Sequence, residues 1–324
     1  MKDGPRSRPG SYFRSEPPKV GLEQGLALEQ VGQDTYRNVQ APWTWPNSPV
    51  VPGGTLAGLA AAAAYKTVAQ GFAIDMLSVQ FIAGPTAKTK MHFKVDRLND
   101  GGRFASRLVT TTQNGKIITH VTCSFVRASA MGGPSISHTP QRATSDAISK
   151  ITFDDLDENR HDEGPWMRFQ RLSLENDRMG YRPERSLPEH LVHTFVATIS
   201  PPIKAPESEI HVLGIIALSD YHVVDCPPIT HHLGFGQPLL GDETRTPTNN
   251  DFDRFTSLNH TVHFHAHEGF RADEFTYIEA RCPWSGRRRG LIETRIFSKD
   301  GTLIATCTQE GYYVLKEGIL KEKL

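Results

Sequence analysis

Apolar residues fall into two long runs along the chain, and each run is followed by shorter stretches in which apolar and polar residues alternate. The Ala- and Leu-rich run at 55–68 contains no helix breaker except Gly58, which predicts a helix. The run at 209–224 predicts a second helix. β-Branched and alternating stretches predict four strands after each helix, at 77–83, 91–98, 103–113, 116–126, 256–267, 275–284, 290–298 and 302–315.

This order of elements predicts an α+β fold in which a long helix lies on each antiparallel sheet. Asn114-Gly115 is a strong signal for a hairpin turn, and Lys299-Asp300-Gly301 gives the equivalent turn in the second half. Self-similarity at a fixed spacing indicates an internal duplication.

The two halves match by counting. Arg103 and Arg289 are 186 residues apart, and Gly115 stands at the same spacing from Gly301. In this register Cys123 of the first half stands where Gln309 stands in the second. We therefore expect the chemistry to be retained in one repeat only.

Polar, Pro- and Gly-rich stretches mark the boundaries between these units. We predict a disordered tail at 1–18, a first repeat at 19–127, an irregular connection at 128–188 and a second repeat at 189–324. A further polar stretch at 239–254 predicts a loop inside the second repeat.

The composition excludes several classes of protein. Apolar residues make up 38% of the chain, and Lys+Arg and Asp+Glu both number 36, so charge gives no reason to expect a nucleic-acid partner. No apolar run approaches the roughly 20 residues of a membrane-spanning helix, so we expect a soluble protein without a membrane span. The four cysteines form no CxxC pair, which favours reduced thiols in an intracellular protein.

Common catalytic and binding motifs are absent: the chain has no GxSxG, GxGxxG, GxxxxGK[ST] or HExxH. His263, His265 and His267 alternate, so on a strand all three face one side. They suit either a metal site or an ordinary half-buried strand. Because no nearby Cys, Asp or Glu completes a ligand set, we expect no metal.

Two short features suggest binding of an anion. Gly53 and Gly54 open the first predicted helix, where free backbone N–H groups and the lack of side chains suit the close approach of a ligand. The run Arg287-Arg288-Arg289 fits either a solvated hairpin flank or a clamp for a phosphate or nucleotide group. The sequence leaves both interpretations of the arginines open.

Several stretches of the chain resemble one family. In the second half these are ALSDYH (217–222), TSLNHTVHFH (256–265), FRADEF (270–275), CPWSGRRRG (282–290) and KDGTLIATCTQEG (299–311). In the first half they are GGTLAGLAAAAA (53–64), FIAGP (81–85) and DGGRFASRLVTTTQNGKIITHVTCSF (100–125). Together they resemble the acyl-CoA thioesterase II family.

The resemblance implies a double hotdog fold, in which two tandem repeats each wrap an antiparallel sheet around a long helix. It also implies hydrolysis of an acyl-CoA or a related acyl thioester to a carboxylic acid and a free thiol. Water would be the nucleophile, without a metal or organic cofactor. Chains with this fold usually associate further, so we expect a homo-oligomer.

Carried over by motif, the catalytic group of the family falls on Asp220, Ser257 and Gln309. A carboxylate, a hydroxyl and an amide can jointly hold one water by hydrogen bonds, with Asp220 as general base or orienting group. The backbone at Gly53 and Gly54 would stabilise the oxyanion. Each member of the trio also has an ordinary structural interpretation: a helix-end acid, a hydroxyl bonded to backbone, and an amide facing solvent.

Two departures from the family pattern suggest a divergent pocket. Asn259 replaces the aspartate of the usual Leu-Asp-His, and Asp75 stands near the place of a first-half histidine. We expect both near the substrate. They also keep two rivals open: hydratase or dehydratase chemistry on the same scaffold, and a non-catalytic acyl-CoA-binding protein.

The compartment is weakly indicated. Lys323-Leu324 fits the end of an SKL-type peroxisomal signal, but Glu322 replaces its small residue. We predict a cytoplasmic protein, with the peroxisome as the alternative that the family resemblance implies.

Overall fold

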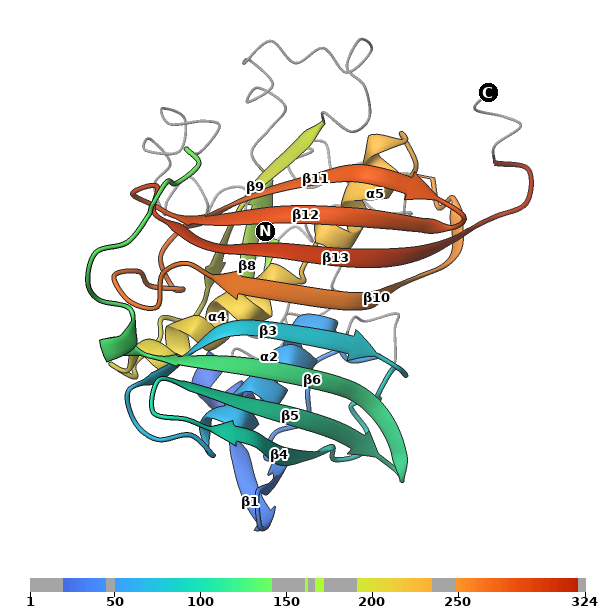
Figure 1. Ribbon diagram of the computed structural model, residues 1–324. Helices are drawn as coiled ribbons and strands as arrows, with labels where there is room; N and C mark the ends of the chain where they lie inside the picture. The colour runs from blue at the N-terminus through green and yellow to red at the C-terminus, as the bar shows by residue number, and fades with distance from the viewer. Residues whose placement is uncertain are drawn as a thin grey trace, which may run out of the picture.

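The computed structural model describes residues 20–44, 50–141, 161–162, 167–171, 191–234 and 249–319. The tail predicted at 1–18 and most of the connection predicted at 128–188 lie outside these residues. The described strands form one 13-stranded sheet in the order β1-β2-β4-β5-β6-β3-β10-β13-β12-β11-β9-β8-β7. The long helices lie together against one side of this sheet (Figure 1). This arrangement of helices on an antiparallel sheet is the predicted α+β fold.

The first half supplies one long helix and one arm of the sheet. Its elements are α1 (Leu22–Gly25), β1 (Leu28–Gly32), β2 (Thr35–Asn38), α2 (Gly53–Tyr65), β3 (Phe72–Phe81), β4 (His92–Asp100), β5 (Phe104–Gln113), β6 (Lys116–Arg127) and the 3₁₀ turn η1 (Ala128–Ala130).

The second half supplies the other arm. Its elements are β7 (His161–Asp162), β8 (Met167–Arg171), β9 (Val192–Ile199), α4 (Ser208–Ser219), the 3₁₀ turn η6 (Val223–Asp225), α5 (Cys226–Thr230), β10 (Phe252–Phe264), β11 (Thr276–Gly286), β12 (Arg289–Ser298) and β13 (Leu303–Leu315).

The two arms join where β3 pairs with β10. The strands are antiparallel, with Gln80 opposite Asn259 at one end and Met76 opposite His263 at the other. Between them the hydroxyls of Ser78 and Thr261 lie 2.9 Å apart. The sheet is therefore continuous across the two halves.

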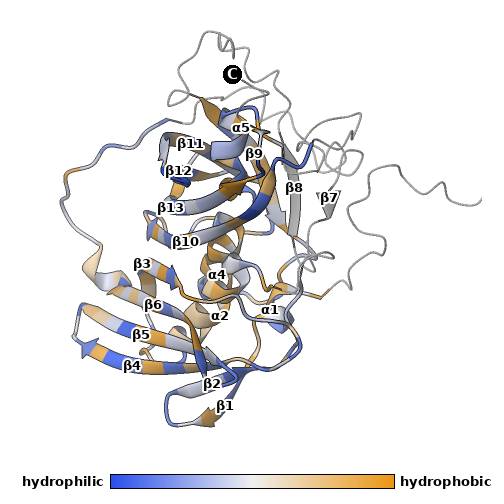
Figure 2. Cartoon of the chain, turned by 90° about the vertical axis from the view of Figure 1, so that its right-hand side faces the viewer, coloured by the Kyte–Doolittle hydropathy of each residue, from blue (hydrophilic) through white to orange (hydrophobic). Residues whose placement is uncertain are grey.

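Helices α2 and α4 form the centre of the core. Both are apolar around most of their circumference, as expected for helices enclosed on all sides (Figure 2). A Cβ at Gly54 would overlap the carbonyl oxygen of Ala217 on α4, so only glycine fits there. This close approach brings the start of α2 against the end of α4.

The two long helices and the eight strands predicted from the alternation are present, with shifted ends. The second helix ends at Ser219 rather than at residue 224, because His222 adopts a left-handed conformation with φ 59° and short turns follow. Strand β10 begins at Phe252, inside the stretch predicted as a loop. Strands β1, β2 and β9 were not predicted, and β7 and β8 lie within the predicted connection.

The spacing between the halves is not uniform. Thr122 of β6 and Thr308 of β13 keep the predicted 186 residues. The pairings Arg107–Cys123 and Ile292–Gln309 instead place β5 and β12 at a spacing of 185. The predicted match of Arg103 with Arg289 is thus wrong by one residue, because the hairpin loop before β13 is longer than the loop before β6.

One stretch among the described residues, Ser208–Thr230, is long and apolar enough to cross a membrane by length and composition alone. It contains α4 and the short turns after it, and 72% of its apolar window is buried inside the protein. Core helices pass the same test, so the expected lack of a membrane span stays a prediction.

Candidate active site

The predicted trio comes together where α4 ends over β10 and β13. Gln309 bridges the other two residues through its amide nitrogen: Nε2 donates to Oδ1 of Asp220 at 2.8 Å and to Oγ of Ser257 at 2.7 Å. Asp220 directly follows the last residue of α4, while the two strands are neighbours in the sheet. Three residues far apart in the sequence thus form one connected group.

Asp220 is also held by the first half of the chain. The backbone N–H of Gly54, in the first turn of α2, donates to Oδ2 at 2.7 Å. The residue is 9% exposed, and burial raises the pKa of its carboxyl from 3.8 to about 6, although the bonds from Gly54 and Gln309 lower it. Above that pH the side chain is a carboxylate that accepts hydrogen bonds from two fixed donors, and it binds a proton more tightly than an ordinary aspartate does.

The amide oxygen of Gln309 is the unsatisfied atom of the group. The side chain is 1% exposed, and Oε1 is buried and has no hydrogen-bond partner among the residues that the structure describes. Its orientation is set by the carboxylate, which accepts only from the nitrogen. Ser257 Oγ accepts from the same nitrogen, so its own O–H remains able to donate. An acceptor and a donor beside the Asp220 carboxylate could therefore hold a small polar molecule such as water.

A second buried polar pair lies next to the trio. Ser219 Oγ donates to the carbonyl of Ile216 at 2.9 Å and lies 2.7 Å from Nε2 of His260. The Ser219 hydroxyl has one proton, so it donates to only one of these two partners at a time. Burial lowers the pKa of His260 to about 4, so the ring is neutral. The pair is thus a buried polar contact beside the trio.

Sequence reasoning missed this pair. Both residues are sequence or register neighbours of the trio: Ser219 precedes Asp220, and His260 pairs with Gln309 across β10 and β13. The sequence motifs Ser-Asp and Asn-His contain both residues, but nothing in the sequence indicates that Ser219 and His260 touch.

Gly53 and Gly54 both lie against Asp220, and the arrangement differs from the oxyanion site that the sequence suggested. The N–H of Gly54, predicted to serve the oxyanion, is donated to Asp220. A Cβ at Gly53 would lie 2.7 Å from Oδ2 of Asp220 and 2.8 Å from the ring of Phe81. The two glycines therefore let the carboxylate sit directly on the helix start.

Asp75 is not near the trio. It lies in β3 next to Met76, which pairs with His263 at the far end of the β3–β10 contact. Ser257 is six residues before His263, which is about 20 Å along an extended strand. The charge of Asp75 instead acts on His265 and His267. The structure thus separates Asp75 from the residues with which the sequence grouped it.

Asn259 also points away from the trio. A bulge in β10 between Ser257 and Asn259 changes the alternation of the strand. Asn259 is exposed, and its Nδ2 lies 3.5 Å from Oε2 of Glu310. Its neighbour Ser257 is the residue that faces Gln309.

The alternating histidines make no metal site with the described residues. His263 in β10 and His265 just after its end are both exposed, and His265 Nε2 lies 2.9 Å from the hydroxyl of Thr306. No group of three His, Cys, Asp or Glu side chains is placed to hold an ion in the described part of the chain.

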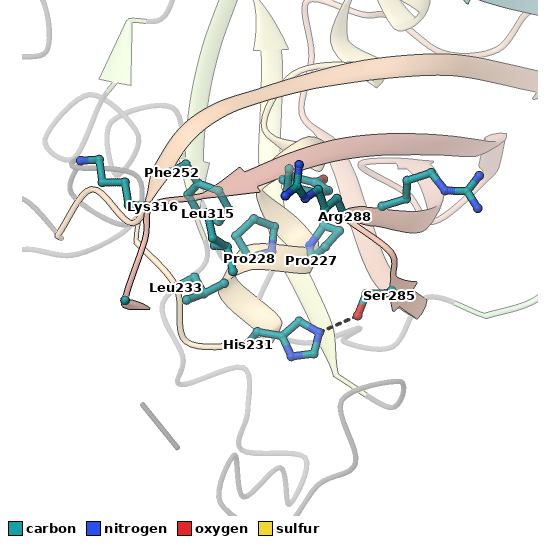
Figure 3. A pocket seen from close by; sticks show the side chains of 13 residues that line it. Pro227, Pro228, His231, Leu233, Phe252, Ser285, Arg288, Leu315 and Lys316 are labelled. Carbon is teal, nitrogen blue, oxygen red and sulfur yellow. Dashed lines mark hydrogen bonds between the residues drawn. The ribbon is translucent and has the colours of Figure 1, made fainter. Parts of the chain in front are cut away.

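The three arginines separate into different roles. Arg287 and Arg288 form the two-residue turn between β11 and β12, with φ of 51° and 63°, and Arg289 begins β12. Arg288 and Arg289 line a pocket of about 500 Å³ near α5 (Figure 3), whereas Arg287 does not. Arg289 Nη1 is paired with Oε1 of Glu310 at 3.0 Å.

Solved structures share this architecture. The chain is similar to an acyl-CoA thioesterase II from Mycobacterium marinum, with a TM-score of 0.69, 23% identity, and coverage of 92% of this chain and 100% of that one. It is also similar to a hot dog fold protein from Alicyclobacillus acidocaldarius, with a TM-score of 0.65, 17% identity, and coverage of 91% and 98%. The fold is the predicted double hotdog.

Sequence comparisons give the family. Residues 41–126 match the model of the acyl-CoA thioesterase N-terminal domain, and residues 152–313 match that of the C-terminal domain. Acyl-coenzyme A thioesterase 8 from Mus musculus is 27% identical over 92% of this chain and 90% of its own. Acyl-CoA thioesterase 2 from Haemophilus influenzae is 23% identical over 80% and 86%. The chain belongs to the acyl-CoA thioesterase family, which confirms the resemblance seen in the sequence.

Proposed function

We propose that this protein hydrolyses acyl-CoA thioesters to a carboxylic acid and CoA, with a water held and activated by Asp220, Gln309 and Ser257. One observation carries the assignment of the site. Gln309 binds both partners through its nitrogen and leaves its buried oxygen as an acceptor beside the carboxylate. Membership of the acyl-CoA thioesterase family supports the substrate.

In this mechanism the water donates one O–H to Oε1 of Gln309 and the other to the carboxylate of Asp220. The carboxylate removes a proton as the water oxygen attacks the thioester carbonyl carbon, and the carbonyl π electrons move to the oxygen. The tetrahedral intermediate then collapses: the C=O bond re-forms, the C–S bond breaks, and the proton held by Asp220 passes to the leaving sulfur, which gives CoA and restores the carboxylate. A pKa near 6 leaves Asp220 ionised at pH 7 yet still basic enough to accept the proton.

The oxyanion needs donors that are in place before the reaction. In this proposal the donors are backbone N–H groups in the first turn of α2, beside Asp220, other than the N–H of Gly54 that is already bonded to the carboxylate. No resident cofactor enters the proposal, because the carboxylate and the amide already supply the base and the orientation of the water.

Release of thiol from a panel of acyl-CoA chain lengths tests the proposal. Asp220→Asn should abolish turnover, whereas Asp75→Asn, a matched change at a carboxylate far from the trio, should retain it. Full activity in Asp220→Asn would overturn the assignment of the base.

The same panel tests the rivals. A hydratase needs an acid–base pair, but the nearest buried histidine, His260, turns Nε2 toward Ser219 rather than toward Asp220. Incubation with an enoyl-CoA should give hydrolysis without hydration. A non-catalytic acyl-CoA-binding protein would release no thiol from any substrate.

We further propose a homo-oligomer in the cytoplasm, with the peroxisome as the alternative compartment. Strand β1 is at one edge of the sheet, where backbone groups are available for pairing with another chain. Light scattering at several concentrations tests association; a monomer at all of them would contradict it. Imaging of the tagged chain with and without its last three residues tests the compartment, since a peroxisomal signal there would be lost.

A further inference from the structure

A pocket lies between α5 and the sheet, beyond the trio. Its volume of about 500 Å³ is in the range of small-molecule sites. Its apolar lining is Pro227, Pro228, Leu233, Phe252, Tyr313 and Leu315. Its polar lining is His231, Ser285, Arg288, Arg289 and Lys316, and no carboxylate is among the residues that line it.

The pocket lies on the same face of β13 as the catalytic amide. Inward-facing positions alternate along the strand from Gln309 to Tyr313 and Leu315. These residues are four and six positions beyond Gln309, or about 13 and 20 Å along an extended strand. The pantetheine arm of CoA has the backbone length of about five residues, so extended it spans about 16 Å. The pocket is therefore one pantetheine length from the reacting centre.

The floor of the pocket includes the rings of Pro227 and Tyr313, which pack where two glycines face each other across β12 and β13. Gly290 pairs with Gly311. A Cβ at Gly311 would overlap the phenol of Tyr313, and one at Gly290 would lie 2.7 Å from the ring of Pro227. Tyr313 Oη donates to the carbonyl of Val224 at 2.8 Å, which fixes the ring against the sheet. The result is a rigid apolar surface suited to a planar base.

The rim of the pocket is cationic. Arg288 and Lys316 lie on opposite sides of the Pro227–Pro228 pair (Figure 3). Arg289 is paired with Glu310, and Lys316 Nζ donates to the backbone carbonyl of Asn250 at 2.7 Å, which does not neutralise it. Arg288 forms no ion pair within the described part of the chain. An unpaired guanidinium and an ammonium thus border an apolar floor.

The turn that carries Arg288 is conformationally costly. Both of its residues are left-handed, a conformation that is unfavourable for residues other than glycine and for which Asn-Gly is the usual choice. Strain of this kind is retained where a side chain is needed. The cost therefore supports a role for the arginine side chain rather than for the turn alone.

We infer that this pocket binds the phosphorylated nucleotide end of CoA, with Arg288 and Lys316 on its phosphates and the Pro227–Tyr313 surface under its base. The inference rests on the proposed function, because the pantetheine arm must reach Gln309. An acyl chain is the less suitable occupant, because it would gain nothing from the cations and would desolvate them.

Kinetics with full and truncated substrates test the inference. Arg288→Gln should raise KM for an acyl-CoA about tenfold, the effect of losing one charge-assisted hydrogen bond, with kcat nearly unchanged. It should not change kcat/KM for the same acyl group on N-acetylcysteamine, which has no nucleotide. Arg287→Gln is the matched control: it has the same charge change and a left-handed residue in the same turn, but outside the pocket.

Equal effects of the two substitutions on acyl-CoA would overturn the inference, as would an equal loss on the truncated substrate. A loss in Arg288→Gln that grows with acyl-chain length would also overturn it and assign the pocket to the acyl chain.

Binding of adenosine 3′,5′-bisphosphate by calorimetry separates this inference from the proposed function, because it requires no hydrolysis. Binding weakened about tenfold by Arg288→Gln and by Lys316→Gln, but not by Arg287→Gln, supports the site even if no thioester is cleaved. Hydrolysis that depends on Asp220, without any binding of the bisphosphate, would retain the function and reject the pocket.

Discussion

The two halves of the sheet are built alike but differ in the residues at equivalent positions. In β10 and β13 His260 pairs with Gln309, and in β3 and β6 Leu77 pairs with Cys123. Each pair follows a bulge at the same place in its strand, after Ser257 in one half and after Ile74 in the other. The backbone of the first half could therefore present a site of the same geometry.

The first half uses these positions for packing instead. Cys123 and Ile74 are fully buried, and burial raises the pKa of the Cys123 thiol to about 12, so it stays neutral. Lys66 follows α2 as Asp220 follows α4, but it is exposed. The comparison shows that a shared backbone allows a site, whereas the polar side chains and their mutual hydrogen bonds make one.

The pocket follows the same division. Gly311 corresponds to Phe125, which is fully buried and packs edge-on against Tyr65 with ring centroids 5.2 Å apart. In the second half the missing side chain at Gly311 leaves space for the ring of Tyr313. At equivalent positions, a phenylalanine thus fills the core of the first half, and a glycine leaves space for a ring that lines the pocket in the second.

The largest expected effect is on kcat, when the carboxylate of Asp220 in the second half is neutralised. Asp220→Asn should lower kcat for acyl-CoA by about 10²–10⁴-fold, the usual contribution of a general base. Thiol release at saturating substrate measures it. Activity within threefold of wild type would mean that this carboxylate is not what distinguishes the second half chemically from the first.

The same substitution should stabilise the fold. The carboxyl has a pKa of 3.8 unfolded and about 6 folded, so the folded state binds the proton more tightly and stability falls as pH rises from about 4 to 6. Above pH 6 the ionised group lowers the free energy of unfolding by about 3 kcal/mol, and asparagine removes this penalty. Urea unfolding at pH 8 should show a gain of about 1–3 kcal/mol that disappears at pH 4. A loss at pH 8 would contradict it.

Gln309→Met removes the bridging amide while keeping its length. Asp220 and Ser257 would each lose a donor, and the water would lose its acceptor, so we expect kcat to fall about 10–10²-fold, as when hydrogen bonds that position a reacting group are lost. Cys123→Ala is the control at the equivalent position of the first half and should leave kcat within twofold. Equal losses of kcat in the two variants would indicate that both changes disturb the fold, rather than that Gln309 positions the water.

The pH profile should report the same carboxylate. Because the base must be ionised, kcat/KM should be level above about pH 6 and fall about tenfold per pH unit below it. In Gln309→Met the acidic limb should move to higher pH, since the bond from Gln309 lowers the pKa of Asp220. A profile that is flat from pH 5 to 8 in the wild type would exclude Asp220 as the base.

The smallest expected effect concerns the turns. Replacing Arg287-Arg288 with Asn-Gly should raise the free energy of unfolding by about 1–2 kcal/mol, because left-handed residues are relieved. It should also raise KM for acyl-CoA. The converse change at Asn114-Gly115, the left-handed turn of the first half, should destabilise by a similar amount without changing KM. Urea unfolding measures the change in stability of both variants, and kinetics measures KM. If the Asn-Gly variant is no more stable than wild type, the Arg287-Arg288 turn is not strained.

Much of the fold could be predicted because alternation and turn chemistry are local properties. The strands around Asn114-Gly115 and Gly301, and the apolar helices, follow from residues within a few positions of each other. Strands β1 and β2 were missed because they are short and most of β1 is exposed, so no alternation marks them. The trio came from motifs, and its hydrogen bonds came only from the structure.

Other features of the site depend on register and helix packing, which no local pattern encodes. Asp75 was expected near the substrate, but antiparallel pairing of β3 with β10 places it at the far end of the contact. The bond from Gly54 to Asp220 joins residues 166 positions apart, and it exists because α2 and α4 touch through a glycine.

The bond from Gly54 to Asp220 has a consequence for how activity relates to assembly. The proposed base belongs to one repeat, while the backbone N–H that orients it belongs to the other. The proposed site therefore depends on how the two repeats pack against each other. A change anywhere between α2 and α4 that shifts the helices slightly would silence turnover before it unfolds either repeat. The rate of turnover would therefore report how well the two repeats are docked. If the repeats were expressed as separate polypeptides, they would regain activity only to the extent that they reassociate.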